Sequence, residues 1–389
     1  KFYAREGFVA VALCWLVLAV TGALPFVLSR EIPFAVDAIF EAASGFTTTG
    51  ATILGDVEAL SHASMLWRCL MHWVGGMGIL VFMLIVLPLA GGHTIYLMRA
   101  ESPGPSVSKI SPHMRDTALI LYAIYFGLTV LQIILLLFGG MPMFDAICVS
   151  LGTAGTGGFG NWNNSIAHYD SAYLQNVISV FMILFGINFN AYFLLLTRKF
   201  KQLFKIEEIR VYLGVIAVFT TLIAFNVRGC FGSLRESFHH SLFQVASIIT
   251  TTGFASVDFS MWPQTSKTIL VLLMFIGACA GSTGGGIKTT TFFVLLSGIY
   301  SAATNHSERA FHNAIPKDAF RKASVISMLA VFLVMTASYL MLIFDPQLSL
   351  RDVLFEMISA FSTSGLSTGI TPQLSAQSRI LSIIMMYIG

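Results

Sequence analysis

Four stretches of this chain end in small residues and a glycine at one fixed distance from an opening polar residue. In each stretch the glycine follows that residue by 13 positions. The stretches read Asp37-AIFEAASGFTTT-Gly50, Asp145-AICVSLGTAGTG-Gly158, His240-SLFQVASIITTT-Gly253 and Asp352-VLFEMISAFSTS-Gly365. Backbone carbonyls at such a turn can replace the hydration shell of an ion, and glycine permits the torsions that aim them. Neutral oxygens without a ring of carboxylates favour a monovalent over a divalent cation.

The second stretch differs from the others, because Gly155-TGG-Phe159 stands where the others carry a run of Thr or Ser. If the four stretches surround one ion, this difference makes their ring uneven, and we expect looser ion selectivity than four identical stretches would give. The alternative interpretation is that the small residues only allow helices to pack closely. Packing alone does not impose the same 13-residue interval four times, so we favour the ion-binding interpretation. Its expected residues are Thr48, Thr49, Gly50, Thr156, Gly157, Gly158, Thr251, Thr252, Gly253, Thr363, Ser364 and Gly365.

The composition indicates that these turns sit in a membrane protein. Of the 389 residues 56% are hydrophobic and only 11% are charged, and the mean hydropathy is +0.79. Apolar runs long enough to cross about 30 Å of hydrocarbon, and without strand-like alternation, predict helical spans. Eight candidate spans lie near 7–28, 63–90, 117–138, 173–197, 211–226, 267–302, 323–344 and 378–389.

The glycine-ended stretches lie between the two spans of successive pairs, so the chain reads as four tandem repeats. We predict an all-α membrane protein in which each repeat is a helix, a short re-entrant pore helix and a second helix around a central pore. Re-entrant backbone survives at membrane depth only where protein or water surrounds it, and the negative end of each short helix favours a cation. The expected repeats are 1–98, 99–200, 201–308 with a glycine-interrupted sixth span, and 309–389, which is incomplete at its C-terminus.

Charge placement predicts the orientation. Fourteen of the 22 Lys and Arg residues lie at the N-terminus and in the connections between repeats, against seven on the side of the glycine-ended stretches. By the positive-inside rule the connections between repeats are expected to be cytoplasmic.

The sixth span carries five glycines within ten residues, which a regular helix tolerates only at a cost of about 1 kcal/mol each relative to Ala. We therefore expect two half-helices joined by a loop directly below the turns, and we interpret this loop as a movable gate. Lys288 would hold the loop or repel cations. A static kink for helix packing is the alternative. The expected gating residues are Gly277, Gly281, Ser282, Thr283, Gly284, Gly285, Gly286 and Lys288.

Buried carboxylates near the turns are a further prediction. Glu41 and Glu356 hold equivalent positions in repeats one and four, where they would concentrate cations or, as we prefer, support the turn from behind. Asp37, Asp145 and Asp352 are interpreted as helix N-caps. Trp67 and Arg68 are interpreted as anchors at the membrane interface.

The chain resembles the Trk/Ktr family of potassium transporters. The resemblance rests on Gly45-FTTTGAT-Ile53, Ser247-IITTTGFA-Ser256, Ser359-AFSTSGLSTG-Ile370, Gly277-ACAGSTGGGIKTT-Thr291, Trp73-VGGMGI-Leu80 and Arg99-AESPG-Pro105. It implies a potassium-selective pore whose filter contains Gly50, Gly158, Gly253 and Gly365, with potassium held by backbone carbonyls and no organic cofactor. It also implies a homodimer in the bacterial inner (plasma) membrane, regulated by a cytosolic nucleotide-binding ring of the TrkA or KtrA type, with no nucleic-acid partner.

Two other functions remain as alternatives. A symporter that couples potassium to Na⁺ or H⁺ by alternating access would favour inverted repeats, whereas these four run the same way. An intramembrane hydrolase is a distant alternative, because Ser282 has no histidine expected within reach, and we expect no enzyme activity. The chain begins without Met and stops inside an apolar run, so we expect both ends to be truncated, and two additional N-terminal helices of some family members have no counterpart here.

Overall fold

The computed structural model describes residues 4–78, 114–304, 309–310, 313–314 and 317–389. The described residues are predominantly helical, and their strands are one antiparallel pair, β1 (Arg309–Ala310) with β2 (Asn313–Ala314). This agrees with the predicted all-α class. The end of the second predicted span, beyond Gly78, and the motif Arg99–Pro105 lie outside the described residues.

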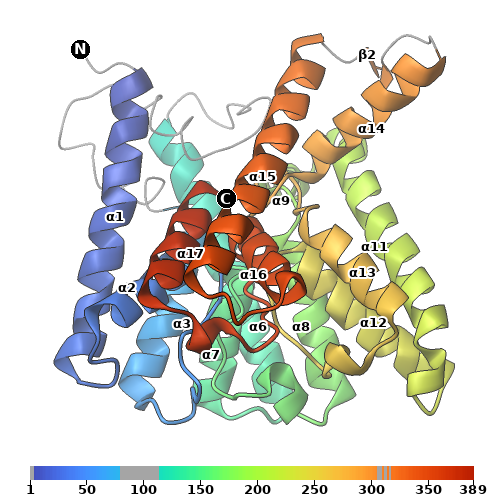
Figure 1. Ribbon diagram of the computed structural model, residues 1–389. Helices are drawn as coiled ribbons and strands as arrows, with labels where there is room; N and C mark the ends of the chain where they lie inside the picture. Colours follow the sequence, from blue (N-terminus) through green and yellow to red (C-terminus); the bar gives the residue numbers. More distant parts are fainter. Residues whose placement is uncertain (1–3, 79–113, 305–308, 311–312, 315–316) are drawn as a thin grey trace.

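The helices fall into four successive groups, each of which opens with a long helix and continues with a shorter one (Figure 1). The groups are α1 (Ala4–Leu28), α2 (Ala35–Phe46) and α3 (His62–Gly76); α6 (Met114–Phe138), α7 (Met143–Ala154), α8 (Ala172–Phe185) and α9 (Phe189–Leu196); α11 (Glu207–Asn226), α12 (Leu234–Ile249), α13 (Gln264–Met274) and α14 (Thr289–Thr304); and α15 (Lys317–Phe344), α16 (Leu350–Ser362) and α17 (Ala376–Ile388). Between the second and third groups lies the single turn α10 (Phe200–Leu203). Short 3-10 turns occupy Ser165–His168, Arg228–Cys230, Phe259–Met261 and Thr371–Gln373.

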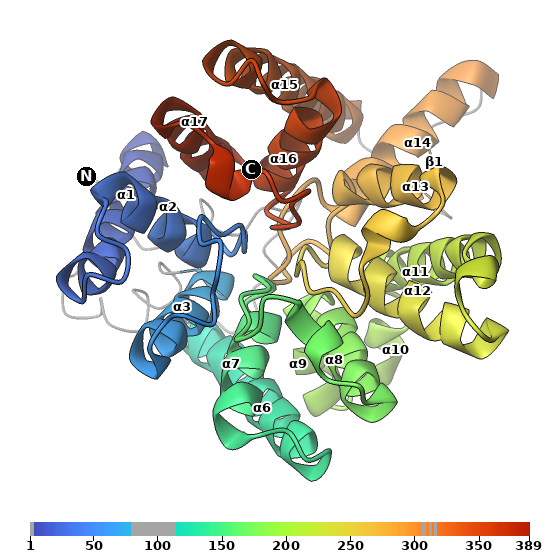
Figure 2. The same cartoon turned by 60° about the horizontal axis from the view of Figure 1, so that its bottom comes forward.

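The four groups stand around one centre (Figure 2), with α2, α7, α12 and α16 toward it and α1, α6, α11 and α15 farther out. The last group returns to the first, because the Tyr387 hydroxyl on α17 donates to the Trp15 carbonyl on α1 at 2.6 Å. Arg379 on α17 also forms an ion pair with Asp37 on α2. The circle of helices is therefore closed by contacts between opposite ends of the sequence.

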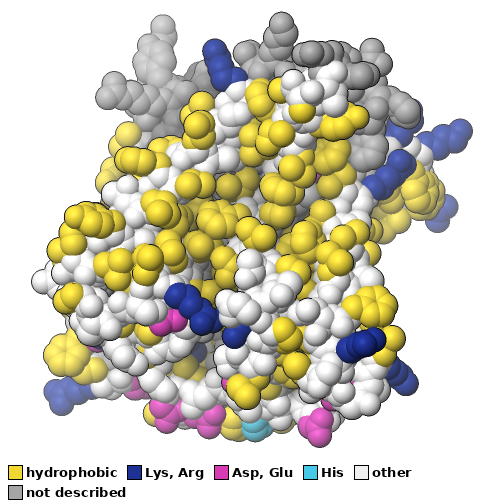
Figure 3. All heavy atoms as spheres, turned by 45° about the vertical axis from the view of Figure 1, so that its right-hand side comes forward, with side chains coloured by type: hydrophobic (Ala, Val, Ile, Leu, Met, Phe, Trp, Pro, Cys, Tyr) yellow, Lys and Arg dark blue, Asp and Glu magenta, His cyan; other side chains and the backbone are white. Residues whose placement is uncertain are grey.

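The face seen in Figure 3 is apolar over its middle. Figure 3 shows hydrophobic side chains covering the central part of one face, with charged side chains mostly toward its lower end and upper right. Helix α15 contributes exposed Met328, Phe332, Met335 and Tyr339 to the surface of the protein. Side chains of this kind on a continuous outer face match a lipid environment.

Three described helical segments are long and apolar enough to cross a membrane, namely Leu119–Phe138, Glu207–Asn226 and Ala319–Phe344. A fourth crossing is possible if α8 and α9, which meet at 93°, form one broken span. The fourth predicted span, 173–197, is therefore not one continuous helix. The sixth span does break as the glycines predict, because α13 ends at Met274 and α14 begins at Thr289.

Candidate functional site: a ring of four turns

The short helices end in the same backbone turn in all four groups. Two residues before each glycine the backbone enters the left-handed region, with φ of 55° at Thr48, 53° at Thr156, 57° at Thr251 and 53° at Thr363. The glycines are left-handed too, with φ of 81° at Gly50, 78° at Gly158, 82° at Gly253 and 67° at Gly365. A β-branched residue is rarely found in this region, so four copies of the same exception mark a shared, imposed geometry.

In each turn one backbone N–H group donates a hydrogen bond to a carbonyl of the preceding helix. The residue after each left-handed threonine donates its N–H to a helix carbonyl five positions earlier: Thr49 to Ser44 at 2.9 Å, Gly157 to Gly152 at 3.0 Å, Thr252 to Ser247 at 2.8 Å, and Ser364 to Ser359 at 3.0 Å. In a trans peptide the C=O points opposite to the N–H. The carbonyls of Thr48, Thr156, Thr251 and Thr363 therefore point away from their helices.

The four turns touch one another in a closed order. A Cβ added to Gly50 would overlap the carbonyl oxygen of Gly157, and one on Gly158 would overlap that of Thr252. One on Gly253 would overlap that of Ser364, and one on Gly365 would overlap that of Thr49. Each glycine thus lies against the next group, and the fourth lies against the first. Only glycine fits these positions, by space as well as by torsion.

The twelve residues that the sequence singled out for ion binding all lie in this ring. Thr49, Thr156, Thr251, Thr252 and Ser364 are fully buried. Within the described part of the chain, no hydrogen bond reaches the carbonyl oxygens of the four left-handed threonines. A buried carbonyl without a donor is costly, and a cation at the centre would supply what these oxygens lack.

The glycine at position 157, where the other turns carry Thr or Ser, has a structural cause that the sequence did not reveal. A Cβ on Gly157 would overlap the imidazole ring of His72, which comes from α3 of the first group. His72 is fully buried, and its Nδ1 lies 2.7 Å from the Gly45 carbonyl oxygen. Its ring also packs on Phe159, with centroids 4.1 Å apart. A histidine therefore occupies the space that a Thr or Ser side chain fills in the other turns.

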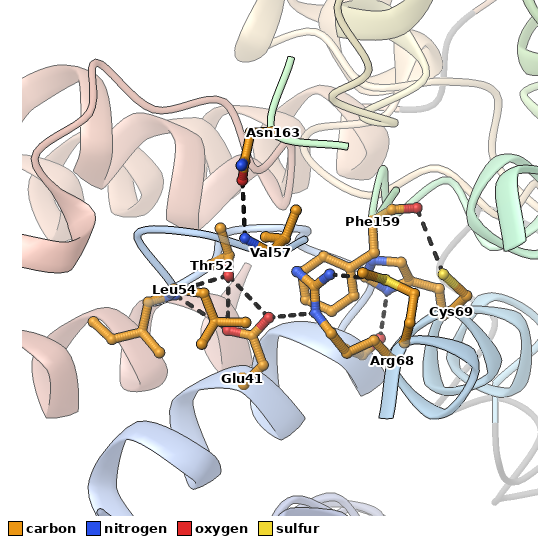
Figure 4. Close-up of polar contacts among 12 residues, drawn as sticks. Glu41, Thr52, Leu54, Val57, Arg68, Cys69, Phe159 and Asn163 are labelled. Atoms are coloured by element: carbon orange, nitrogen blue, oxygen red, sulfur yellow. Dashed lines mark hydrogen bonds and ion pairs between the residues drawn. The ribbon is translucent and has the colours of Figure 1, made fainter. Parts of the chain in front are cut away.

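Glu41 supports the first turn from behind (Figure 4). Its carboxylate accepts hydrogen bonds from the Thr52 hydroxyl at 3.0 Å and the Ile53 N–H at 3.1 Å, beyond the glycine. It also pairs with Arg68 at 2.6 Å, and neither side chain is more than 1% exposed. The Arg68 guanidinium lies 3.9 Å above the Phe159 ring of the second group. Arg68 is therefore a buried counter-ion, and its interpretation as an interfacial anchor is wrong.

Glu356 has the same place in the fourth turn. It accepts a hydrogen bond from the Thr371 hydroxyl at 3.1 Å and from the Thr368 N–H at 3.3 Å, and it also contacts the Ser367 hydroxyl. Both carboxylates thus bind the chain segment that follows the ring glycine. This is the supporting role that the sequence analysis favours for Glu41 and Glu356.

The predicted aspartate N-caps are wrong. The N-cap residues are Phe34, Pro142 and Ser349, and each aspartate lies one turn further in, where its charge still suits the helix N-terminus. Asp145 instead accepts hydrogen bonds from Asn161 and from Tyr169, each at 2.6 Å. Burial first, and then this carboxylate, raise the pKa of the Tyr169 hydroxyl, which lies outside the helices.

The glycine-rich loop between α13 and α14 is folded, and the break in the fourth span is where it docks. The Cys279 N–H donates to the Gly186 carbonyl at 3.1 Å, and the Phe189 N–H donates to the Gly281 carbonyl at 2.9 Å. The Ala280 N–H donates to the Glu208 carboxylate of α11 at 2.7 Å. Lys288 reaches back to donate to the Gly284 carbonyl of the same loop. Sequence reasoning missed Glu208, and Gly186 within an apolar run was the available signal for the break.

Comparisons with known proteins show which proteins this chain is similar to. A family model described as "TrkH: Cation transport protein" matches residues 1–389. The Trk system potassium uptake protein TrkH of Salmonella typhimurium is 39% identical over 297 residues, which are 75% of this chain and 61% of that protein. TrkG of Escherichia coli is 36% identical over 298 residues with the same coverage. The chain thus spans about 61% of the length of these relatives.

A solved structure agrees with the fold. The crystal structure of the potassium transporter TrkH from Vibrio parahaemolyticus covers 100% of this chain and 83% of its own chain, with a TM-score of 0.86 and 25% sequence identity.

Proposed function

Because the chain belongs to the TrkH family of cation transport proteins, we propose that it carries potassium ions across a membrane through the ring of four turns. The observation that supports this most directly is the set of four buried threonine carbonyls that point away from their helices and accept no hydrogen bond from the described residues. The relatives' names describe potassium uptake, which is the same substrate. The ligands are neutral oxygens, as suits a monovalent cation that must also leave again.

We further propose that the loop of residues 275–288 is the gate. It lies against the ring itself: a Cβ on Gly285 would overlap the Thr363 hydroxyl, and one on Gly284 would come within 3.0 Å of the Thr250 carbonyl oxygen. We infer that a folded segment in contact with the ring blocks an ion that leaves the ring on that side. Its glycines allow a second backbone arrangement in which the path is free.

Family membership supports partner proteins, and the placement of Lys and Arg supports an orientation. We propose that the chain works as a homodimer in a bacterial inner membrane, with the connections between repeats in the cytoplasm and a cytosolic nucleotide-binding subunit as regulator. The relatives' names call each of them part of a Trk system, which supports a multi-component assembly. The basic segment 198–210, between the second and third groups, would face this regulator.

Uptake of radioactive rubidium into vesicles that contain the complete protein tests the proposal. Uptake should be blocked by external K⁺ and little affected by Na⁺. Gly253→Ser should abolish uptake or its ion preference, because the new Cβ overlaps the Ser364 carbonyl at a φ of 82°. The matched control is Gly214→Ser on α11, where an added Cβ meets nothing within 4 Å. Robust uptake that ignores both K⁺ and Gly253→Ser would refute the pore.

A further inference from the structure

The four left-handed threonines are equivalent in backbone but not in what their hydroxyls do. The Thr251 hydroxyl accepts a hydrogen bond from the Gly285 N–H of the loop at 2.8 Å and donates its own proton to the Thr250 carbonyl at 2.7 Å. The Thr156 hydroxyl lies 2.9 Å from the Thr283 carbonyl oxygen of the loop and 2.6 Å from the Gly155 carbonyl oxygen, between which it shares one proton. Two threonines of the ring therefore bond directly to the loop.

The other two threonines do not. The Thr363 hydroxyl is buried and has no hydrogen-bond partner in the described structure, although Gly285 lies directly against it. The Thr48 side chain packs toward Gly75 of α3, and among the described residues no hydrogen bond joins it to the loop. The ring thus contains its own pair of internal controls.

We propose that Thr251 and Thr156 are the positioning residues that hold the loop against the ring, so that opening of the loop frees two of the four ring threonines. This inference rests on the proposed gating role of the loop and assigns its holding contacts. When the loop leaves, the Gly285 N–H and the Thr283 carbonyl must find water, and the two hydroxyls lose a neighbour that fixes them. Gate position and the geometry of half of the ring are then coupled.

Valine is the informative substitution, because it replaces the hydroxyl with a methyl group and keeps the β-branched shape at the same φ. In the closed state Thr251→Val leaves the half-buried Gly285 N–H without its acceptor, whereas in the open state water can serve. Loss of one such bond should raise the open probability about three- to tenfold. Thr156→Val should raise it less, because that hydroxyl is shared.

Single-channel recording of the complete protein in planar bilayers measures this. Thr48→Val and Thr363→Val report what the loss of a hydroxyl does to the ring itself, and Thr251→Ser should return the open probability toward that of the natural protein. The expected order is Thr251, then Thr156, then the two controls, with altered K⁺ over Na⁺ preference accompanying the first two. Equal effects of all four valines, or no effect of Thr251→Val, would overturn the proposal.

A readout that does not depend on ion flux comes from Cys279, a fully buried thiol within the loop. After Cys14 and Cys230 are replaced with Ala, the labelling rate of the Cys279 peptide by a small water-soluble thiol reagent should rise in Thr251→Val and not in Thr363→Val. Such a difference in a protein without potassium flux would refute the transport proposal and keep this assignment. Potassium flux with the same labelling rate in both variants would refute this assignment alone.

Discussion

At the scale of single residues, the ring also depends on buried polar groups that lie behind it. Glu41 and Arg68 form an ion pair with at most 1% exposure, and the carboxylate also holds Thr52 and Ile53. Breaking a buried pair by removing one partner leaves an uncompensated charge, which is far more costly than breaking an exposed pair.

We therefore expect Arg68→Ala to lower the free energy of unfolding by about 3–5 kcal/mol, measured as thermal unfolding in detergent. The double variant Glu41→Gln with Arg68→Met should recover part of this loss, because no charge is then left unpaired. The control is Arg379→Ala, which breaks the partly exposed pair with Asp37 and should cost about 1 kcal/mol or less. Equal losses for Arg68→Ala and Arg379→Ala would contradict the supporting role of the buried pair.

At the scale of elements, the break between α8 and α9 and the break between α13 and α14 are joined by hydrogen bonds. The bend between α8 and α9 exposes the Gly186 carbonyl and the Phe189 N–H, and both are satisfied by the loop between α13 and α14. The first turn of α11 supplies the third contact, from Glu208 to the Ala280 N–H. Backbone polar groups freed by a break at membrane depth must find partners within the protein, so the two breaks stabilise one another.

Glu208→Leu should loosen the loop, because it removes a charge-assisted hydrogen bond of about 1.5–3 kcal/mol. The expected result is a rise of roughly tenfold or more in open probability, seen as faster rubidium uptake under non-activating conditions. Glu207→Leu is the matched control, since the same charge is removed one residue away and Glu207 makes no hydrogen bond to the loop in the described structure. Identical behaviour of the two variants would show that Glu208 acts only through its charge.

At the scale of the whole molecule, four similar groups enclose one axis, but they are not identical. His72 fills the space beside Gly157 that a side chain occupies in the other turns, so the second turn is built differently from the first, third and fourth. Three similar turns and one different turn form a less regular ring. For this reason we expect Na⁺ to compete weakly but measurably with rubidium uptake, and complete rejection of Na⁺ would contradict this expectation.

The same asymmetry predicts a coupled pair of substitutions. Gly157→Ser alone should strongly reduce rubidium uptake, because its side chain overlaps the His72 ring. Combining it with His72→Ala should restore part of the uptake and increase the preference for K⁺ over Na⁺. His72→Ala alone serves as the control for the lost contact with Gly45. If the double variant is no better than Gly157→Ser, steric exclusion by His72 is not the reason for the glycine.

The features that could be predicted from the sequence are local and repeated along the chain. The 13-residue interval identified four equivalent turns, and the glycines near 277–286 predicted the break in the sixth span, because torsional freedom and helix propensity belong to the residues themselves. Aspartate N-caps were misassigned by one turn, since Ser349 and the residues at 34 and 142 begin the helices earlier than the repeat does.

Which turn lies against which, and which side chains lie behind each turn, could not be predicted from the sequence and is seen in the folded protein. The pairing of Glu41 with Arg68, the place of His72 beside Gly157, and the docking of the loop on Glu208 and Thr251 all join residues from different helices. Such contacts depend on how the four groups close around the axis. A sequence pattern does not contain this information, because each residue of the ring contacts residues of other groups that are far away in the sequence.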